Sequence, residues 1–243
     1  MPQPLILALG TLSCVLLIGC AATNDSHPSS AAHESADLPV TQEEQARATP
    51  RSVLDRMLQG NARYVAGEYT PLNAKASRAA SATGQYPLAY VLSCVDSRVL
   101  VEPVFDMGIG DVFVGRVAGN FENVDQLGSM EFATAAAGSK LVMVLGHQSC
   151  GAIKGAADGV ELGNLTELLT ELEPAVEDVD GHEGHRTSKN AAFIAEVVEA
   201  NVRRTVEDIR RRSDVLAERE AQGQLMIVGA VYSLETGEVT LLD

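Results

Sequence analysis

The chain has 243 residues and carries 33 acidic against 18 basic side chains, a formal net charge of −15. This acidity, with no cluster of Lys and Arg that neighbouring acids leave unbalanced, predicts that nucleic acid is not a partner. The length is sufficient for one domain with a full hydrophobic core, even after about fifty N-terminal residues of different composition are set aside.

An apolar segment opens the chain. Residues 5–18 have the length of a signal-peptide core and are too few to span a bilayer comfortably. They end in Leu17-Ile18-Gly19-Cys20, which resembles the lipobox of bacterial lipoproteins. The resemblance implies a signal peptide over residues 1–19, a lipidated Cys20 and export to the periplasm, with the outer membrane favoured. Because no Lys or Arg precedes residue 5, a plain secretory signal stays an alternative.

Small, polar and acidic residues dominate the next segment, residues 20–50. Such a composition buries too little apolar surface to offset the conformational entropy of the chain. We therefore expect a flexible tether here, with the folded domain confined to residues 51–243.

Helical and strand patterns alternate along the expected domain. Apolar residues at helical spacing predict helices over 52–66, 126–137, 188–212 and from 148 onward. Short apolar runs predict strands over 88–93, 112–114, 141–146, 225–232 and 238–242. Loops are expected over 67–87 and in an acidic stretch over 158–184.

This alternation predicts an α/β fold. We expect a mostly parallel central sheet with helices on both faces and a short final edge strand. In such sheets, ligands bind outside the carboxyl ends of the strands. Cys94 directly follows the first predicted strand and His147 the third, so both lie where a site is expected.

Cys94 and Cys150 are the two cysteines of the expected domain. In an exported protein, such a pair is ordinarily interpreted as a disulfide. The alternative is a metal site, because His147 and Cys150 are three residues apart at the start of a predicted helix and can face one ion. The helix amino end would favour the Cys150 thiolate. A Cys, His, Cys set without a fourth soft ligand is typical of zinc with an open coordination position.

The residues after Cys94 favour the zinc interpretation. Asp96 and Arg98 are two positions apart and point the same way in an extended loop. An arginine can grip the carboxylate with two hydrogen bonds and lower its pKa. A salt bridge that only stabilises the loop is the alternative. His182 and His185 allow a second, surface metal site, although the neighbouring glycines favour a solvated loop.

Two motifs carry a family resemblance. Cys-Val-Asp-Ser-Arg-Val at 94–99 and Gly-His-Gln-Ser-Cys-Gly-Ala at 146–152 resemble the signature motifs of the β-class carbonic anhydrases. Further likeness lies at 58–64, 116–120, 128–133 and 228–232. The resemblance therefore covers nearly the whole expected domain.

The resemblance implies one Zn²⁺ per subunit, bound by Cys94, His147 and Cys150. It implies reversible hydration of carbon dioxide to bicarbonate and a proton by a zinc-bound hydroxide. Asp96 would accept a hydrogen bond from this hydroxide, and Arg98 would hold Asp96 in place. In some relatives the aspartate itself moves onto the metal, so a closed state of the site is a further possibility.

The resemblance also implies a substrate site formed by Val117, Gly119, Asn120 and Gly151. Val117 stands where many relatives have Asn, which makes this wall more apolar. Because a few relatives of this fold hydrolyse carbonyl sulfide or carbon disulfide, the resemblance leaves this reaction on the same zinc as the alternative function. A further alternative is a zinc-binding protein without turnover. Asp96 and Arg98 argue against it, because such a protein has no use for them. The family resemblance also predicts a homodimer or homotetramer, with the helix at 52–66 crossing to the neighbouring subunit.

Overall fold

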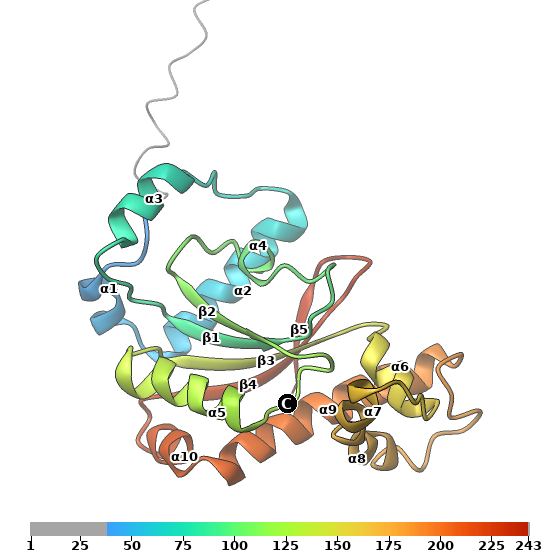
Figure 1. Ribbon diagram of the computed structural model, residues 1–243. Coiled ribbons are helices and arrows are strands. Elements are labelled where there is room, and N and C mark those ends of the chain that lie inside the picture. Colours follow the sequence, from blue (N-terminus) through green and yellow to red (C-terminus); the bar gives the residue numbers. More distant parts are fainter. Residues whose placement is uncertain (1–37, 243) are drawn as a thin grey trace, which may run out of the picture. The chain divides into compact units, whose positions relative to one another are not determined.

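The computed structural model describes residues 38–242, and Figure 1 shows their arrangement. The predicted signal peptide, Cys20 and the tether up to residue 37 lie outside the described residues. No helix within the described range is long and apolar enough to cross a membrane.

Five strands form one sheet within residues 38–242. They are β1 (Ala89–Ser93), β2 (Val112–Arg116), β3 (Leu141–His147), β4 (Met226–Tyr232) and β5 (Val239–Leu242). Their order is β2-β1-β3-β4-β5, with the first four strands parallel and β5 antiparallel to β4. The predicted α/β fold with a mostly parallel sheet and a short final edge strand is confirmed.

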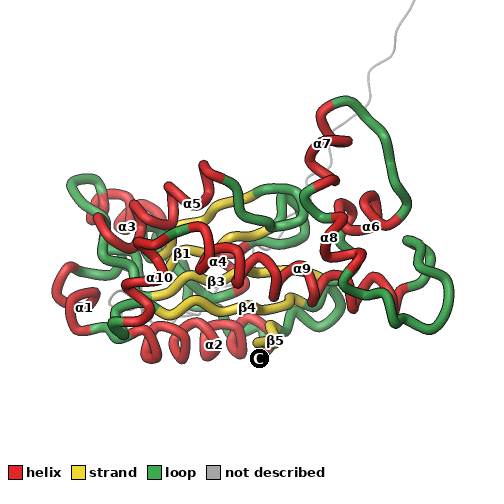
Figure 2. Tube along the Cα trace, turned by 90° about the horizontal axis from the view of Figure 1, so that it is seen from below, coloured by secondary structure: helices red, strands yellow, loops and turns green. Residues whose placement is uncertain are grey.

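Helices occupy both faces of the sheet (Figures 1 and 2). Their bounds are α1 Gln42–Arg47, α2 Pro50–Ala66, α3 Ala74–Ser81, α4 Val101–Val104, α5 Val124–Glu131, α6 Gly151–Ala157, α7 Asn164–Thr170, α8 Glu173–Glu177, α9 Ala191–Arg212 and α10 Asp214–Ala221. A π-helical turn, η1 (Phe132–Ala136), continues α5.

Two hydrophobic layers hold these helices to the sheet. On one face, Met57 of α2 packs in a cluster with Val91 and Met143 of the central strands. On the other face, Val202 of α9 packs with strand residues such as Val144. The long helix α9 approaches the sheet closely, because a Cβ added to Gly146 would lie 2.6 Å from Val202. Helices on both faces of the sheet thereby hold in place the carboxyl ends of β1 and β3, where Cys94 and His147 lie.

The flexible tether predicted to reach residue 50 is wrong for its last part. Residues 42–47 form α1, which a capping box of Thr41 and Glu44 starts. Gln45 is buried and donates to the carbonyl oxygens of Pro87 and Ala137, both at 2.8 Å. Val40 N–H donates to Asp111 at 2.7 Å. These polar contacts to distant residues order a segment whose composition alone predicts no fold.

Several short helices lie in segments predicted as loops. Helix α3 lies in the loop expected over 67–87, and α7 and α8 lie in the acidic stretch over 158–184. The helix expected from residue 148 begins at Gly151. Helix α2 buries its apolar face on its own sheet, and its contact with a neighbouring subunit stays a prediction.

Candidate metal centre

The predicted ligands meet at the carboxyl ends of two adjacent strands. Cys94 follows β1, His147 is the last residue of β3, and Cys150 is the N-cap of α6. Strands β1 and β3 pair in parallel, while the chain continues from β1 to β2 on the opposite side. The site therefore lies at the topological switch point of the sheet, where α/β proteins bind ligands.

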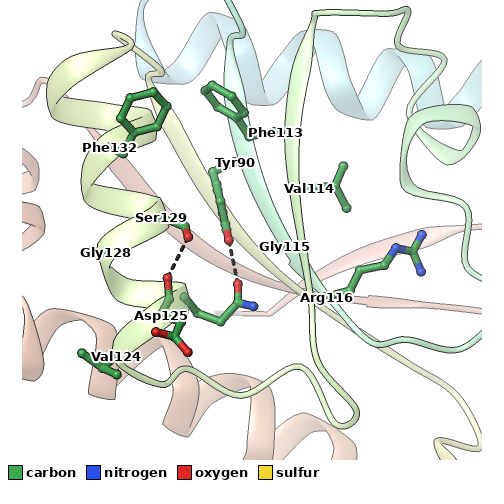
Figure 3. Close-up of a pocket in the computed structure, with 11 residues that line it drawn as sticks. Tyr90, Phe113, Val114, Gly115, Arg116, Val124, Asp125, Gly128, Ser129 and Phe132 are labelled. Carbon is green, nitrogen blue, oxygen red and sulfur yellow. Dashed lines mark hydrogen bonds between the residues drawn. The ribbon is translucent and has the colours of Figure 1, made fainter.

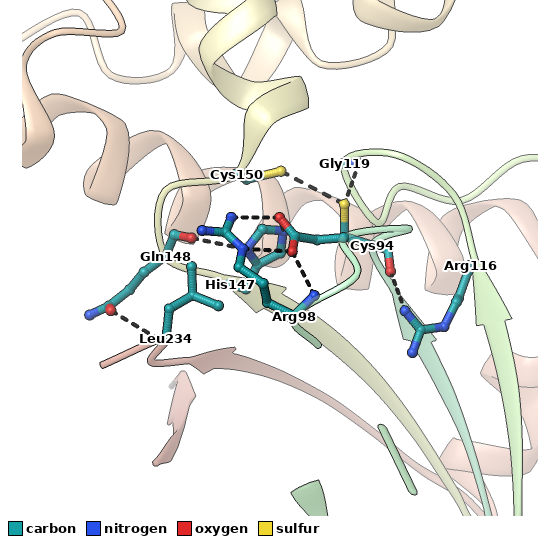
Figure 4. A network of polar contacts seen from close by, with 9 residues as sticks. Cys94, Arg98, Arg116, Gly119, His147, Gln148, Cys150 and Leu234 are labelled. Atoms are coloured by element: carbon teal, nitrogen blue, oxygen red, sulfur yellow. Dashed lines mark hydrogen bonds and ion pairs between the residues drawn. The ribbon is translucent and has the colours of Figure 1, made fainter. Parts of the chain in front are cut away.

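The ligand atoms of Cys94, His147 and Cys150 all lie within 4.8 Å of one another, and all three residues are buried. The two sulfur atoms are 3.9 Å apart, and both thiols are free (Figure 4). Two thiolates on a tetrahedral zinc at about 2.3 Å stand roughly 3.8 Å apart, whereas a disulfide bond measures about 2.05 Å. The geometry thus matches zinc and excludes the predicted disulfide alternative in this structure.

His147 presents one ring nitrogen to this cluster. Its Nδ1 lies 2.9 Å from the carbonyl oxygen of Gln148, and because a carbonyl only accepts, Nδ1 carries the proton. The side chain is fully buried, and Nε2 has no hydrogen-bond partner among the described residues. A buried ring nitrogen without a hydrogen-bond partner, on a ring whose other nitrogen is fixed by a carbonyl group, is suited to bind a metal.

The two thiols influence each other strongly. The pKa of Cys94 is lowered, mainly because its thiolate accepts a hydrogen bond from the Cys150 thiol. The pKa of Cys150 is raised by the same contact and by burial. The backbone N–H groups of Ala152 and Ile153 act in the opposite direction and lower the pKa of Cys150, as expected of the amino end of helix α6.

Asp96 and Arg98 form the predicted bidentate pair beside the ligands. Arg98 Nε donates to Asp96 Oδ1 at 2.9 Å and Nη2 to Oδ2 at 2.7 Å, and the Arg98 backbone N–H adds a third bond at 3.0 Å. The Arg98 hydrogen bonds lower the pKa of Asp96 well below its usual range. Asp96 Oδ2 lies 3.8 Å from His147 Nε2. The carboxylate is therefore ionised, faces the cluster and is held by Arg98.

The turn after β2 closes the site from another side. Arg116 donates to the carbonyl oxygens of Cys94 at 2.9 Å and Val99 at 2.5 Å, so it fixes both ends of the loop that carries Asp96. Gly119 N–H donates to Cys94 Sγ at 3.4 Å. In the sequence, Arg116 is visible only as part of a family motif, because contacts to backbone carbonyl groups leave no residue pattern.

The four predicted substrate residues differ in their burial and in how closely their surroundings pack against them. Val117 is half-buried between two apolar clusters, and Asn120 is buried with Nδ2 unpartnered among the described residues. A Cβ on Gly119 would lie 2.6 Å from Leu172, whereas one on Gly151 would meet no atom within 4 Å. Close packing therefore requires glycine at 119 and not at 151, and the substrate roles of these residues stay predictions.

The predicted alternative of a second metal site at His182 is not supported. Its Nδ1 lies 3.0 Å from Glu196, and its Nε2 accepts from Asn190 at 2.8 Å. Within residues 38–242, the one group of three or more potential metal ligands is that of Cys94, His147 and Cys150. His182 instead ties the loop before α9 to that helix.

A large open cavity lies away from the metal ligands, along the edge strand β2 (Figure 3). Its volume is about 800 Å³, and its walls include Tyr90, Phe113, Arg116, Val124 and Phe132. The side chains of Val124 and Phe132 are 74% and 56% exposed. Arg116 lines this cavity and also binds the Cys94 loop, so the cavity adjoins the site.

A protein-family model described as carbonic anhydrase matches residues 89–239. Carbonic anhydrase 2 of Mycobacterium tuberculosis is 36% identical over 200 residues, which cover 80% of this chain and 93% of the relative. The carbonic anhydrase of Mycolicibacterium smegmatis is 37% identical over 183 residues, covering 75% and 88%. The β-carbonic anhydrase CafA of Aspergillus fumigatus superposes with a TM-score of 0.61 at 26% identity, covering 67% and 78%. The chain belongs to the β-class carbonic anhydrase family.

Proposed function

We propose that this protein catalyses the reversible hydration of carbon dioxide to bicarbonate and a proton. The observation that carries the proposal is the convergence of Cys94, His147 and Cys150, with an unpartnered His147 Nε2, beside a carboxylate that Arg98 holds. Zinc fits this donor set, and when bound it makes water a nucleophile at neutral pH. A storage or structural site has no use for an ionised Asp96 at this position.

The residues around the ligands have separable tasks. Asp96 accepts the hydrogen bond of the attacking nucleophile, since both of its oxygens are acceptors at every working pH. Arg98 occupies Asp96 from the far side and thereby keeps the carboxylate off the metal. The sulfur atoms pack in an apolar cluster with Phe121, which excludes water from that side. The apolar Val117 borders the same cluster and suits a linear, apolar substrate.

Stopped-flow measurement of carbon dioxide hydration by the zinc-loaded protein tests this function. We expect turnover that a chelator abolishes and added zinc restores. A parallel sulfide-release assay with carbonyl sulfide and carbon disulfide tests the alternative, to which the apolar Val117 lends support. Sulfide release without hydration of carbon dioxide would assign the protein to the alternative activity. If neither reaction occurs, the protein is a zinc-binding protein without turnover.

We further propose that the protein is a homodimer joined through β2. This strand is at the edge of the sheet, so its outer backbone groups are free to pair with a second copy. The exposed Val124 and Phe132 beside it form an apolar surface of the kind that subunit interfaces bury. A two-fold arrangement makes the same patch complementary to itself. A homotetramer would require a further interface.

We also propose export and lipid attachment at Cys20, supported by the apolar residues 5–18 and the lipobox-like 17–20. The periplasmic face of the outer membrane is the proposed location. Labelling of cells with a radioactive fatty acid should mark the wild-type protein and spare the Cys20→Ser variant. Labelling of that variant, or none of the wild type, would contradict the anchor.

A further inference from the structure

Asn201 is a buried polar residue in the middle of the long helix α9. Its side chain is 3% exposed, and its Nδ2 donates to the carbonyl oxygen of Gly119 at 2.8 Å. These residues are 82 positions apart in the sequence. Burying an amide is costly unless it is hydrogen-bonded, and Asn forms helices no better than the valines around it. Helix stability and core packing therefore do not explain Asn at this position, whereas the bond to Gly119 does.

Gly119 links this helix to a metal ligand. Its carbonyl oxygen accepts from Asn201, while its own N–H donates to Cys94 Sγ at 3.4 Å. Gly119 and the following Asn120 both have positive φ values, 84° and 44°, a conformation that glycine adopts freely and that is uncommon for other residues such as Asn120. Leu172 blocks one side of Gly119, and Asn201 anchors its carbonyl group.

We propose that Asn201 is a positioning residue of the metal centre. By anchoring the Gly119 carbonyl, it keeps the Gly119 N–H directed at the Cys94 sulfur, and so fixes the orientation and electron density of that ligand. The Gly119 N–H···S bond of 3.4 Å weakens quickly when its donor turns away. Partners that orient metal ligands in this way typically change metal affinity or activity by about 10- to 100-fold when they are removed.

The inference rests on the zinc centre proposed above, and its test observes the metal rather than turnover. The Asn201→Asp variant keeps the shape of the side chain and removes the N–H donor, and Asn201→Leu removes both polar groups. Thr205→Val is the matched control, because Thr205 is one turn later in α9 and equally buried at 2% exposure. Circular dichroism and the unfolding temperature establish that each variant is folded.

The first measurement uses protein loaded with cadmium-113, in which a metal-bound sulfur transmits scalar coupling to a hydrogen-bonded amide proton. We expect coupling between the metal and the Gly119 amide proton in the wild type and in Thr205→Val, and its loss in both Asn201 variants. Coupling that persists in the Asn201 variants, or that is absent from the folded wild type, would overturn the proposal.

The second measurement is the rate at which zinc is lost to excess chelator. Both Asn201 variants should lose zinc about tenfold faster or more, while Thr205→Val should stay within about twofold of the wild type. Equal rates in all four proteins would refute the role of Asn201. A wild type that holds neither metal would instead refute the metal centre itself, so the two failures are distinguishable.

Discussion

At the scale of single residues, the state of Asp96 decides what the metal centre can do. Its pKa is lowered because Arg98 donates to both of its oxygens. A folded-state pKa below the usual value of about 3.9 means that the pairing stabilises the fold above that pH, and that this stability is lost as the pH falls through the lowered pKa. Asp96 is therefore an ionised acceptor throughout the neutral range.

The Asp96→Asn variant tests this role. An amide can turn its NH₂ group toward the nucleophile and no longer offers two acceptors, so the rate of carbon dioxide hydration should fall by about 100-fold or more. Zinc should remain at one ion per chain, because Asp96 is held by Arg98 rather than by the metal. The exposed Asp180→Asn serves as the control and should keep wild-type activity. Loss of zinc from Asp96→Asn would contradict the assignment.

The residues of the site differ in how visible they are in the sequence. Cys94, His147 and Cys150 could be predicted because their residue types and spacing are themselves the signal. The bonds from Arg116 to Cys94 and from Asn201 to Gly119 could not. They end on backbone carbonyl groups 22 and 82 residues away, and any residue would supply the same acceptor.

At the scale of elements, the strands were predictable and the short helices were not. The four parallel strands follow the predicted ranges to within one or two residues. The central strands β1 and β3 are buried throughout, and such burial requires continuous apolar runs. Helices α1, α3, α7 and α8 have eight residues or fewer. Such helices are not stable alone, and tertiary contacts at a few positions decide whether they form.

Helix α1 shows this dependence most clearly, because Gln45 alone connects it to two distant carbonyl groups. Replacing Gln45 by Ala leaves the Pro87 and Ala137 carbonyl groups without this donor and should destabilise the protein by about 2 kcal/mol. For a domain of this size, that corresponds to a decrease in Tm of roughly 4–8 °C, measured by calorimetry. Gln59→Ala, at an exposed position of α2, should change Tm little. Equal Tm values for both variants would mean that α1 is not anchored through Gln45.

At the scale of the whole molecule, the net charge and the apolar patch beside β2 together decide whether copies of the chain associate. The net charge of −15 keeps identical copies apart unless a specific apolar patch brings them together. The β2 edge offers such a patch, and Phe113 and Phe132 meet there with ring centroids 6.0 Å apart. The proposed dimer would bury this patch beside the Arg116 clamp and so place the interface next to the metal centre.

The Phe132→Glu variant tests the dimer. Two-fold symmetry would bring the new carboxylates into the buried interface from both subunits, so the dimer should dissociate about 100-fold more readily. Light scattering after size-exclusion chromatography should give twice the mass of one chain for the wild type and the mass of one chain for the variant. Leu162→Glu, exposed in the connection between α6 and α7, should remain dimeric. A monomeric wild type, or a dimeric Phe132→Glu, would contradict the proposed interface.

The most direct test of the metal centre is zinc X-ray absorption on wild-type and Asp96→Asn protein at neutral pH. The three ligands with an open position predict two sulfur scatterers at about 2.3 Å and two lighter atoms at about 2.0 Å, identical in both proteins. One lighter atom belongs to His147 and the other to solvent. A wild-type shell without two sulfurs, or a lighter-atom shell that changes when Asp96 is replaced, would contradict an open zinc held by Cys94, His147 and Cys150.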